Sequence, residues 1–220
     1  MTPTHLGIIM DGNRRWAKQH NKPLMDGHRA GLDVFKDIAL AAFDRGIEYV
    51  SAYVFSTENW QRTQDEVSYL MGLVNKGIDK HLETFHQGGV KLLMLGSRTG
   101  IDEKILKTID RAVAKTKDNT KGTLALCFNY GGQQEIAEAA AKASQPINEA
   151  SLAANLYQPD VPALDFIIRT SGEQRLSGFM LWRAAYAELY FTDTLWPDFT
   201  PDDLDIALKE YAKRQRRHGS

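Results

Sequence analysis

Five short apolar runs, separated by longer amphipathic stretches, limit most strongly how this chain can fold. The runs have the length and the β-branched content of strands and cover residues 6–10, 49–55, 90–95, 123–128 and 164–168. The other stretches carry apolar residues at helical spacing and predict helices over residues 31–45, 65–86, 102–117, 133–143, 148–156 and 201–217. This alternation predicts a mainly parallel central sheet flanked by helices, an α/β fold that binds ligands at the carboxyl ends of its strands.

The composition fits one globular domain over residues 1–220 and excludes several other classes of protein. The 27 Lys and Arg residues against 28 Asp and Glu residues give a formal net charge of −1, which argues against extensive nucleic-acid binding. The single cysteine, Cys127, cannot form an intramolecular disulfide, and its place in a predicted strand indicates core packing. No apolar run approaches the roughly 20 residues that span a bilayer. The N-terminus has no signal-peptide pattern, so we expect a cytoplasmic protein.

A first group of polar residues directly follows the first predicted strand. It is the run Asp11-Gly12-Asn13-Arg14-Arg15-Trp16, within which a helix is predicted to begin. Backbone N–H groups at a helix start, together with two guanidiniums, suit a phosphate or diphosphate. Asp11 would repel that anion unless a divalent cation lies between them, and Mg²⁺ prefers one or two carboxylates with phosphate oxygens and water. An ordinary turn with an aspartate cap is the alternative interpretation.

A second group follows the predicted strand 49–55. It is the run Ser56-Thr57-Glu58-Asn59-Trp60-Gln61-Arg62. Within seven positions it places a hydroxyl, an amide and a guanidinium at one strand end, and Trp60 offers an apolar wall. Ser56 and Thr57 can instead cap the next helix, with Glu58 near its positive end, but capping does not require the residues that follow.

A third group follows the predicted strand 164–168. It is the run Arg169-Thr170-Ser171-Gly172-Glu173-Gln174-Arg175-Leu176-Ser177. Two arginines six positions apart, Arg169 and Arg175, can bind one diphosphate, with Ser177 as a neutral hydrogen-bond donor. The alternative is that Arg169 or Arg175 forms a surface salt bridge with Glu173. Further along, Glu188 lies among apolar and aromatic residues, where a carboxylate is costly unless it is paired or binds a metal.

Together these groups resemble the cis-prenyltransferases, specifically undecaprenyl diphosphate synthase and its relatives. The matching strings run in the family's order along nearly the whole chain: HLGIIMDGN at residues 5–13, GHRAG at 27–31, FSTENW at 55–60, NYGG at 129–132, IRT at 168–170, AYAELYF at 185–191 and LWPDF at 195–199. Each string alone is weak evidence for this family, but six or more strings in the same order are specific to it.

The resemblance implies a Mg²⁺-dependent homodimeric enzyme that extends an allylic diphosphate, here expected to be farnesyl diphosphate, with isopentenyl diphosphate units and cis double bonds. Its product is a lipid carrier, so we expect peripheral contact with a membrane surface. By this similarity Asp11 handles the Mg²⁺-diphosphate, Asn59 is assigned to proton removal, and Glu188 helps to bind the metal. An amide is a poor base, so released diphosphate is an alternative proton acceptor.

The resemblance also implies a set of substrate-binding residues. It assigns Gly12, Asn13, Arg14, Arg15, Trp16 and His28 to the allylic diphosphate; Ser56, Thr57, Glu58, Trp60 and Arg62 to the reacting ends; Arg169, Arg175, Leu176 and Ser177 to isopentenyl diphosphate; and Arg217, in the C-terminal Arg-x-Gly, to a site across the dimer interface. We therefore expect the arginines at strand ends to face both Asp11 and Glu188.

The chain departs from the family pattern at a few positions. Arg14 and Ser171 replace glycines, Leu24 stands where many relatives carry an arginine, and Gln133 stands where arginine is common. None of these changes removes Asp11, Asn59 or Glu188, so we expect catalysis to be retained with altered diphosphate contacts.

Product length is a separate question. Val54 and Phe128 occupy positions where long-chain members of the family tend to carry alanine. We expect their bulk to shorten the product tunnel or to reshape its entrance. A short-chain cis-prenyl diphosphate synthase is therefore the alternative within the family.

Two functions from other classes also stay open. A non-catalytic partner subunit of a heteromeric prenyltransferase typically lacks the aspartate of the Asp-Gly-Asn motif, which this chain keeps as Asp11. A Mg²⁺-dependent phosphohydrolase with Asp11 as its nucleophile would need a second acid nearby or a downstream lysine and aspartate, which the sequence does not identify.

Overall fold

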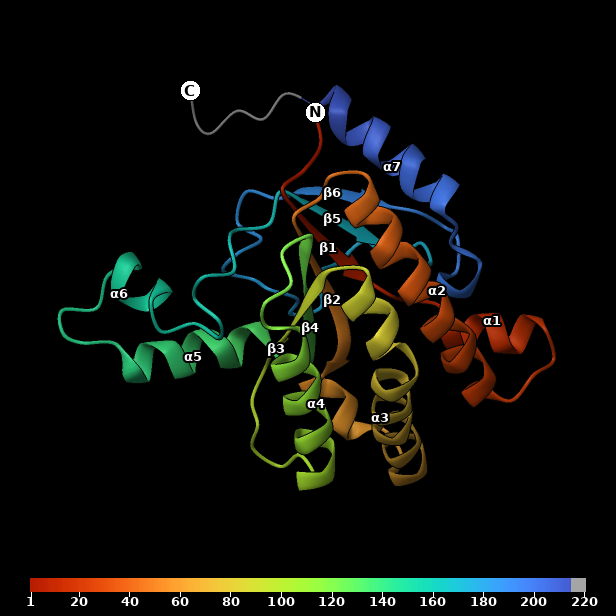
Figure 1. The fold of residues 1–220 in the computed structure, drawn as a ribbon, viewed down its shortest axis with the longest axis horizontal. Helices are drawn as coiled ribbons and strands as arrows, with labels where there is room; N and C mark the ends of the chain where they lie inside the picture. Colours follow the sequence, from red (N-terminus) through yellow and green to blue (C-terminus); the bar gives the residue numbers. More distant parts are fainter. Residues whose placement is uncertain (215–220) are drawn as a thin grey trace.

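The computed structural model describes residues 1–214 and contains one six-stranded sheet in the order β3-β4-β2-β1-β5-β6 (Figure 1). Every neighbouring pair is parallel, which confirms the predicted sheet. The predicted runs form the first five strands: β1 (His5–Ile9), β2 (Tyr49–Ser56), β3 (Val90–Leu95), β4 (Gly122–Tyr130) and β5 (Phe166–Arg169).

The sixth strand, β6 (Glu188–Phe191), was not predicted from the sequence. It is four residues long, and all of its residues are only half-buried because it forms the edge of the sheet beyond β5. So short a run at an edge shows neither the apolar stretch of a central strand nor a clear alternation, which explains why the sequence pattern does not reveal it.

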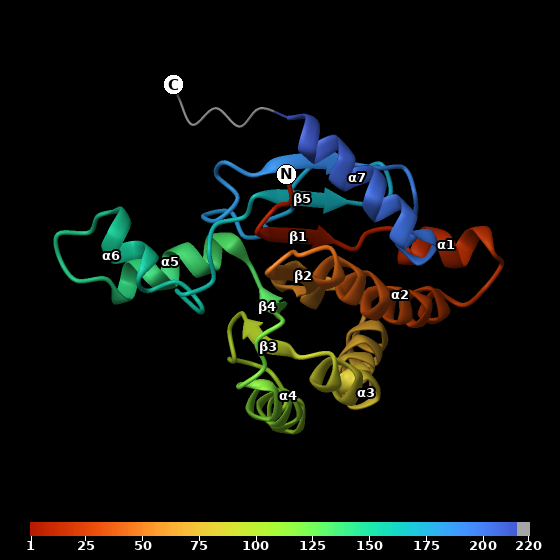
Figure 2. The same cartoon turned by 45° about the horizontal axis from the view of Figure 1, so that its top comes forward.

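The described residues also form seven α-helices and two 3-10 helices, which connect the strands or, for the last two, follow β6. They are α1 (Asn13–Gln19), α2 (Leu24–Asp44), η1 (Thr57–Gln61), α3 (Gln64–Gln87), α4 (Glu103–Thr116), α5 (Gly132–Lys142), α6 (Glu149–Ala153), η2 (Trp196–Asp198) and α7 (Pro201–Lys213). In Figure 2, α7 lies beside β5 and β1 and α2 lies beside β2, whereas α5 and α6 extend to one side of the sheet.

Helix α2 begins at Leu24, well before the predicted start at residue 31. Gly27 and Gly31 break the apolar pattern of this segment, yet both are buried in the helix. A Cβ atom on Gly27 would lie 2.0 Å from the carbonyl oxygen of Asn13, so a glycine lets α2 cross the start of α1 closely.

Helix α7 ends at Lys213 rather than at the predicted residue 217. Arg214 already has an extended backbone. The remaining predicted residues, including Arg217, lie outside the described part of the chain.

The two faces of the sheet bury separate apolar clusters. Leu6 and Ile8 of β1 pack with residues of α2, α3 and α7 on one face. Ile9 belongs to the cluster on the other face, which contains Phe179 and Met180 and is covered mainly by irregular chain rather than by helices. Cys127 is fully buried in this second cluster, as predicted.

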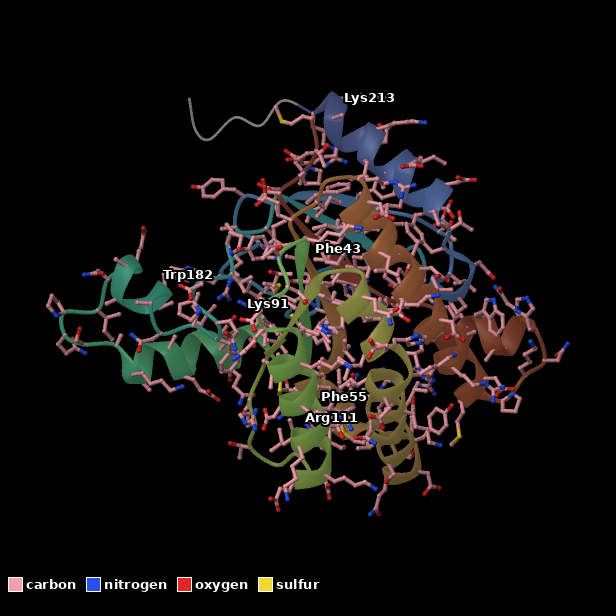
Figure 3. The ribbon with its side chains drawn as sticks, viewed as in Figure 1. Phe43, Phe55, Lys91, Arg111, Trp182 and Lys213 are labelled. Carbon is pink, nitrogen blue, oxygen red and sulfur yellow. The ribbon has the colours of Figure 1, made fainter. Side chains whose placement is uncertain are left out.

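A third apolar cluster lies where β2 and β4 meet α3 and α4. Its members include Phe55, which is labelled in Figure 3 between these two helices, and Phe128. Among residues 1–214, no helix combines the length and the apolar character needed to cross a membrane.

Candidate active site

A cavity of about 330 Å³ opens between the sheet and helices α2 and α3. Most of its polar lining comes from predicted site residues at the carboxyl ends of strands and at nearby helix starts: Asp11, Asn13, His28, Ser56, Asn59, Arg62, Arg169 and Ser177. Tyr53 and His81, which were not predicted as site residues, also line it. The rest of its wall is largely apolar and includes Leu32, Phe35, Leu70, Val74, Ile78, Leu82, Phe85, Leu92, Leu124 and Leu126. The cavity thus combines a group of charges with an apolar interior.

Asp11 follows β1 and is held from three sides. Its backbone N–H donates to the Thr170 hydroxyl at 3.0 Å, and its Oδ1 accepts from the Gly12 N–H at 2.8 Å. Its Oδ2 accepts from Arg169 Nη2 at 2.8 Å and lies 3.7 Å from Arg15 Nη2. Gly12 makes the turn with a φ of 111°, a left-handed conformation that favours glycine.

Arg169, the last residue of β5, connects Asp11 to the third polar group. Its Nη1 donates to the Ser177 hydroxyl at 2.9 Å and to the carbonyl oxygen of Arg175. Ser177 has a left-handed backbone, with a φ of 50°, and its carbonyl accepts from the Tyr53 hydroxyl at 3.2 Å. The predicted isopentenyl diphosphate residues Arg169 and Ser177 are therefore adjacent, and sequence reasoning missed Tyr53.

Arg175 forms the salt bridge that the alternative interpretation predicted. Its Nη1 lies 2.5 Å from Glu173, which also lies 3.3 Å from Arg15. Arg15 further donates to the Ser171 carbonyl at 2.8 Å. Leu176 packs against the second apolar cluster and does not line the cavity.

The second polar group forms the short helix η1 after β2. Ser56 and Asn59 make a reciprocal cap in which Asn59 Oδ1 accepts from the Ser56 N–H at 3.0 Å. Trp60 donates its indole N–H to Asn129 at 2.7 Å, so Asn129, at the end of β4, orients this ring. The capping interpretation of Ser56 is correct, and it coexists with a place in the cavity wall.

Thr57 and Glu58 lie outside the cavity wall. The Thr57 side chain packs against Gly131, because a Cβ on that glycine would lie 2.6 Å from the Thr57 hydroxyl. Trp16 also lies outside: its indole N–H donates to Asp198 at 2.6 Å, and its ring stacks on His20. Trp16 therefore links α1 to η2 by a hydrogen bond.

His28 contributes a buried imidazole to the cavity. Burial and, secondarily, the charge of Arg62 lower the pKa of His28 from 6.5 to about 4, so the ring is neutral near pH 7. Its Nε2 is buried without a hydrogen-bond partner and lies 3.8 Å from Glu66. A buried nitrogen of this kind is available to a ligand.

Glu188 does not lie beside Asp11 within one chain. It begins β6 and is in register with Phe166, whereas Arg169, which contacts Asp11, is in register with Phe191 at the other end of the strand. Its carboxylate accepts from Arg214 at 2.8 Å. The expected grouping of the arginines around both carboxylates is therefore wrong for Glu188 within one chain, and its metal role stays a prediction.

Two further carboxylates complete the charge pattern: Glu173, predicted as a salt-bridge partner, and Glu66, which sequence reasoning did not select. Glu66 lies 2.8 Å from Arg62 and 3.9 Å from Arg14, and Glu173 contacts Arg15 and Arg175. The i,i+4 spacing of Arg62 and Glu66 was the available signal. Within the described residues, each of the five arginines predicted for the site thus lies within 4 Å of an acid.

The chain matches the family model described as "Putative undecaprenyl diphosphate synthase" over residues 9–219. The chain belongs to the cis-prenyltransferase family. This assignment confirms the resemblance of the motifs, and the relatives agree. The trans,polycis-polyprenyl diphosphate synthase of Thermobifida fusca, specific for (2Z,6E)-farnesyl diphosphate, is 44% identical, with 100% of this chain and 81% of that protein covered. The isoprenyl transferase of Neisseria gonorrhoeae is also 44% identical, with 99% and 89% covered.

Solved structures of similar fold include two members of this group. The lavandulyl diphosphate synthase of Lavandula x intermedia, in complex with dimethylallyl diphosphate, gives a TM-score of 0.95 at 32% identity and covers 100% of this chain and 99% of its own. A probable undecaprenyl diphosphate synthase from Campylobacter jejuni gives 0.86 at 30% identity, with both chains fully covered. This cis-prenyltransferase is thus a prenyl-transferring enzyme, as predicted.

Proposed function

We propose that this cis-prenyltransferase condenses isopentenyl diphosphate with farnesyl diphosphate to a Z-polyprenyl diphosphate and releases diphosphate. The observation that carries the proposal is the cavity itself, where Asp11, Arg62 and Arg169 adjoin an apolar wall. The charged end suits two diphosphates, and the apolar interior suits a growing hydrocarbon chain.

The allylic diphosphate is assigned to the side of the cavity formed by α1, α2 and Arg62. Asn13 and His28 line the cavity there, with Arg14 nearby through Glu66. A neutral His28 can donate a hydrogen bond to a phosphate oxygen without adding charge. Loss of the allylic diphosphate leaves a cation, and guanidiniums fixed around the leaving group stabilise the negative charge that develops on it.

Isopentenyl diphosphate is assigned to Arg169, Arg175 and Ser177. Arg169 is almost fully buried, and its hydrogen bonds to Asp11 and Ser177 fix the orientation of its guanidinium. A guanidinium held in one orientation recognises a phosphate more selectively than a mobile ammonium does.

Within one chain, Mg²⁺ fits Asp11 as a site with one protein carboxylate. In the described part of the chain, no group of three or more His, Cys, Asp or Glu side chains could hold a metal ion, so a metal at Asp11 needs oxygens from diphosphate and water. The Asp11 side chain is 32% exposed and can be reached. When bound, Mg²⁺ supplies positive charge that stabilises the departing diphosphate.

The proton released on condensation is assigned to diphosphate rather than to Asn59. The Asn59 carbonyl oxygen already accepts from the Ser56 N–H, and an amide is not basic at neutral pH. Asn59 instead orients the reacting ends from the cavity wall.

A homodimer is part of the proposal. Glu188 lies on the edge strand β6, away from Asp11 of its own chain, so only a second copy can bring this carboxylate to a metal at Asp11. Arg217, outside the described residues, is assigned to the same cross-chain role.

The direct test incubates the purified chain with Mg²⁺, farnesyl diphosphate and labelled isopentenyl diphosphate, followed by butanol extraction. Labelled polyprenyl diphosphate that disappears in Asp11→Ala supports the synthase. Free phosphate alone supports a phosphohydrolase, and no product supports a non-catalytic partner subunit.

A short-chain synthase is the second candidate, favoured by Val54. This side chain lies between the main cavity and a second apolar hollow of about 10 Å³, which Phe128 also lines. A bulkier residue at such a wall limits how far a product can grow. Primers of five, ten and fifteen carbons, compared in the same assay, separate the two candidates by product mass.

A further inference from the structure

Glu66 is the common anionic neighbour of three groups assigned to the allylic diphosphate. One atom, Glu66 Oε1, lies 2.8 Å from Arg62 Nη1, 3.9 Å from Arg14 Nε and 3.8 Å from His28 Nε2. The three groups come from different segments: α1, α2 and the turn after η1. No motif used to recognise the family includes Glu66.

The local structure holds this carboxylate in place. Glu66 lies in the first turn of α3, where a negative charge is favoured by the helix dipole, and its backbone N–H donates to the Thr63 hydroxyl. Its side chain is only 16% exposed. The contact with Arg62 is therefore shielded from solvent more than an ordinary surface ion pair is.

An allylic diphosphate and Glu66 need the same cations. The negative charge of Glu66 lies within 4 Å of both guanidiniums and therefore repels an incoming anion. Glu66 also accepts the hydrogen bond that Arg62 would otherwise donate to that anion. His28 Nε2, in contrast, has no hydrogen-bond partner to give up.

We propose that Glu66 is an internal competitor for the allylic diphosphate pocket: its carboxylate occupies Arg62 and Arg14, and an anionic substrate must displace it. The proposal rests on the assignment of this pocket under the proposed function. In an elongating enzyme, the consequence of this competition is easier release of the diphosphate product. After each condensation, the carboxylate returns to the arginines and helps the diphosphate product to leave.

A positioning role for Glu66 would predict the opposite sign. If the carboxylate served only to hold the arginines in a binding geometry, removing it would weaken the binding of diphosphates. The sign of the effect therefore decides between a competitor and a support.

The test uses Glu66→Gln, which removes the charge but keeps an acceptor for Arg62, and Glu66→Ala, which removes both. Asp110→Asn is the matched control, because Asp110, on α4, forms an exposed ion pair with Arg98 and its loss changes the net charge equally. Calorimetry on the full chain measures the binding of inorganic diphosphate and, without isopentenyl diphosphate, of farnesyl diphosphate.

Both Glu66 variants are expected to bind the two ligands about three- to tenfold more tightly than the wild type and the control at low salt. The difference in affinity between the Glu66 variants and the wild type should shrink at high salt. Added diphosphate should inhibit turnover by the Glu66 variants more strongly than turnover by the wild type. Binding that is unchanged or weaker in Glu66→Gln overturns the proposal. Binding does not require turnover, so an inactive wild type that still shows tighter binding in Glu66→Gln would refute the proposed synthase activity and not the competition.

Discussion

Asp11 Oδ2 and Arg169 Nη2 lie 2.8 Å apart and join two strand ends that are 158 positions apart in the sequence. The pair places a carboxylate suited to a cation directly beside a guanidinium suited to an anion. Because β1 and β5 are parallel neighbours, their carboxyl ends bring the two residues together without any long loop. The contact fixes where the two proposed diphosphates would meet.

Arg169→Lys should selectively weaken the binding of isopentenyl diphosphate. A lysine keeps the charge but cannot reach Asp11 and Ser177 with a rigid fork. We expect the KM for isopentenyl diphosphate to rise about tenfold and the KM for the allylic substrate to change less than about twofold, a loss typical of one charge-assisted hydrogen bond. Arg98→Lys, at an exposed salt bridge, is the control. Equal increases in both KM values would contradict the assignment.

Gly27→Ala should disrupt the junction of α1 and α2. The added Cβ would lie 2.0 Å from the Asn13 carbonyl oxygen, so the helices must move apart. We expect a loss of about 3 kcal/mol or more in the free energy of unfolding, measured by urea denaturation. Gly72→Ala is the matched control, because Gly72 is also in a helix and has open space around it. That variant should be neutral or stabilised by up to about 1 kcal/mol. Similar results for both variants would refute the close contact.

Acid should destabilise the fold through two buried histidines. Burial lowers the pKa of both His5 and His28 from 6.5 to about 4. Between about pH 6.5 and pH 4 the unfolded chain therefore binds more protons than the folded chain, so the free energy of unfolding falls as the pH drops through this window.

The expected loss between pH 7.5 and pH 5 is about 2 kcal/mol for each histidine. Urea denaturation at the two pH values measures it, and His28→Asn should remove roughly half of the difference between them. A wild-type free energy of unfolding that does not change between the two pH values would contradict the burial of these rings.

Val54→Ala should lengthen the product. Val54 lines both the main cavity and the second hollow, whereas Phe128 lines only the hollow, so removing the Val54 methyl groups enlarges the space available to the chain. We expect mass spectrometry to show products at least one isoprene unit longer in Val54→Ala and in Val54→Ala/Phe128→Ala.

Phe128→Ala alone should leave the product length nearly unchanged, because the wall formed by Val54 stays in place. Its cost in stability is about 3–5 kcal/mol, so thermal unfolding of each variant is measured first. Identical product lengths in all variants would contradict this role of Val54.

Much of the fold was predictable, because buried parallel strands produce continuous apolar runs that the sequence displays directly. Strand β6 and the start of α2 were not, since their signals depend on neighbours: β6 is defined by pairing with β5, and Gly27 is explained only by the Asn13 backbone beneath it. The predicted site residues Asp11, Asn59 and Arg169 do line one cavity.

Other features of the site required the structure. Glu66 looks like an ordinary first-turn acid in the sequence, and its contact with Arg14 arises because α1 and α3 both pack against α2. In the sequence Tyr53 looks like any other strand tyrosine, and only the structure shows that its hydroxyl donates to the Ser177 carbonyl oxygen. The position of Glu188 depends on the direction of an edge strand that the sequence does not reveal.

The most direct measurement is the amount of labelled polyprenyl diphosphate formed from farnesyl and isopentenyl diphosphates with Mg²⁺ by the wild type and by Asp11→Ala. Loss of a group that handles the metal and the leaving diphosphate should lower kcat by at least about 100-fold. Thermal unfolding confirms that the variant is folded. Extension by the wild type with this loss in Asp11→Ala is the predicted result; no extension by the wild type, or equal extension by both proteins, would contradict the account.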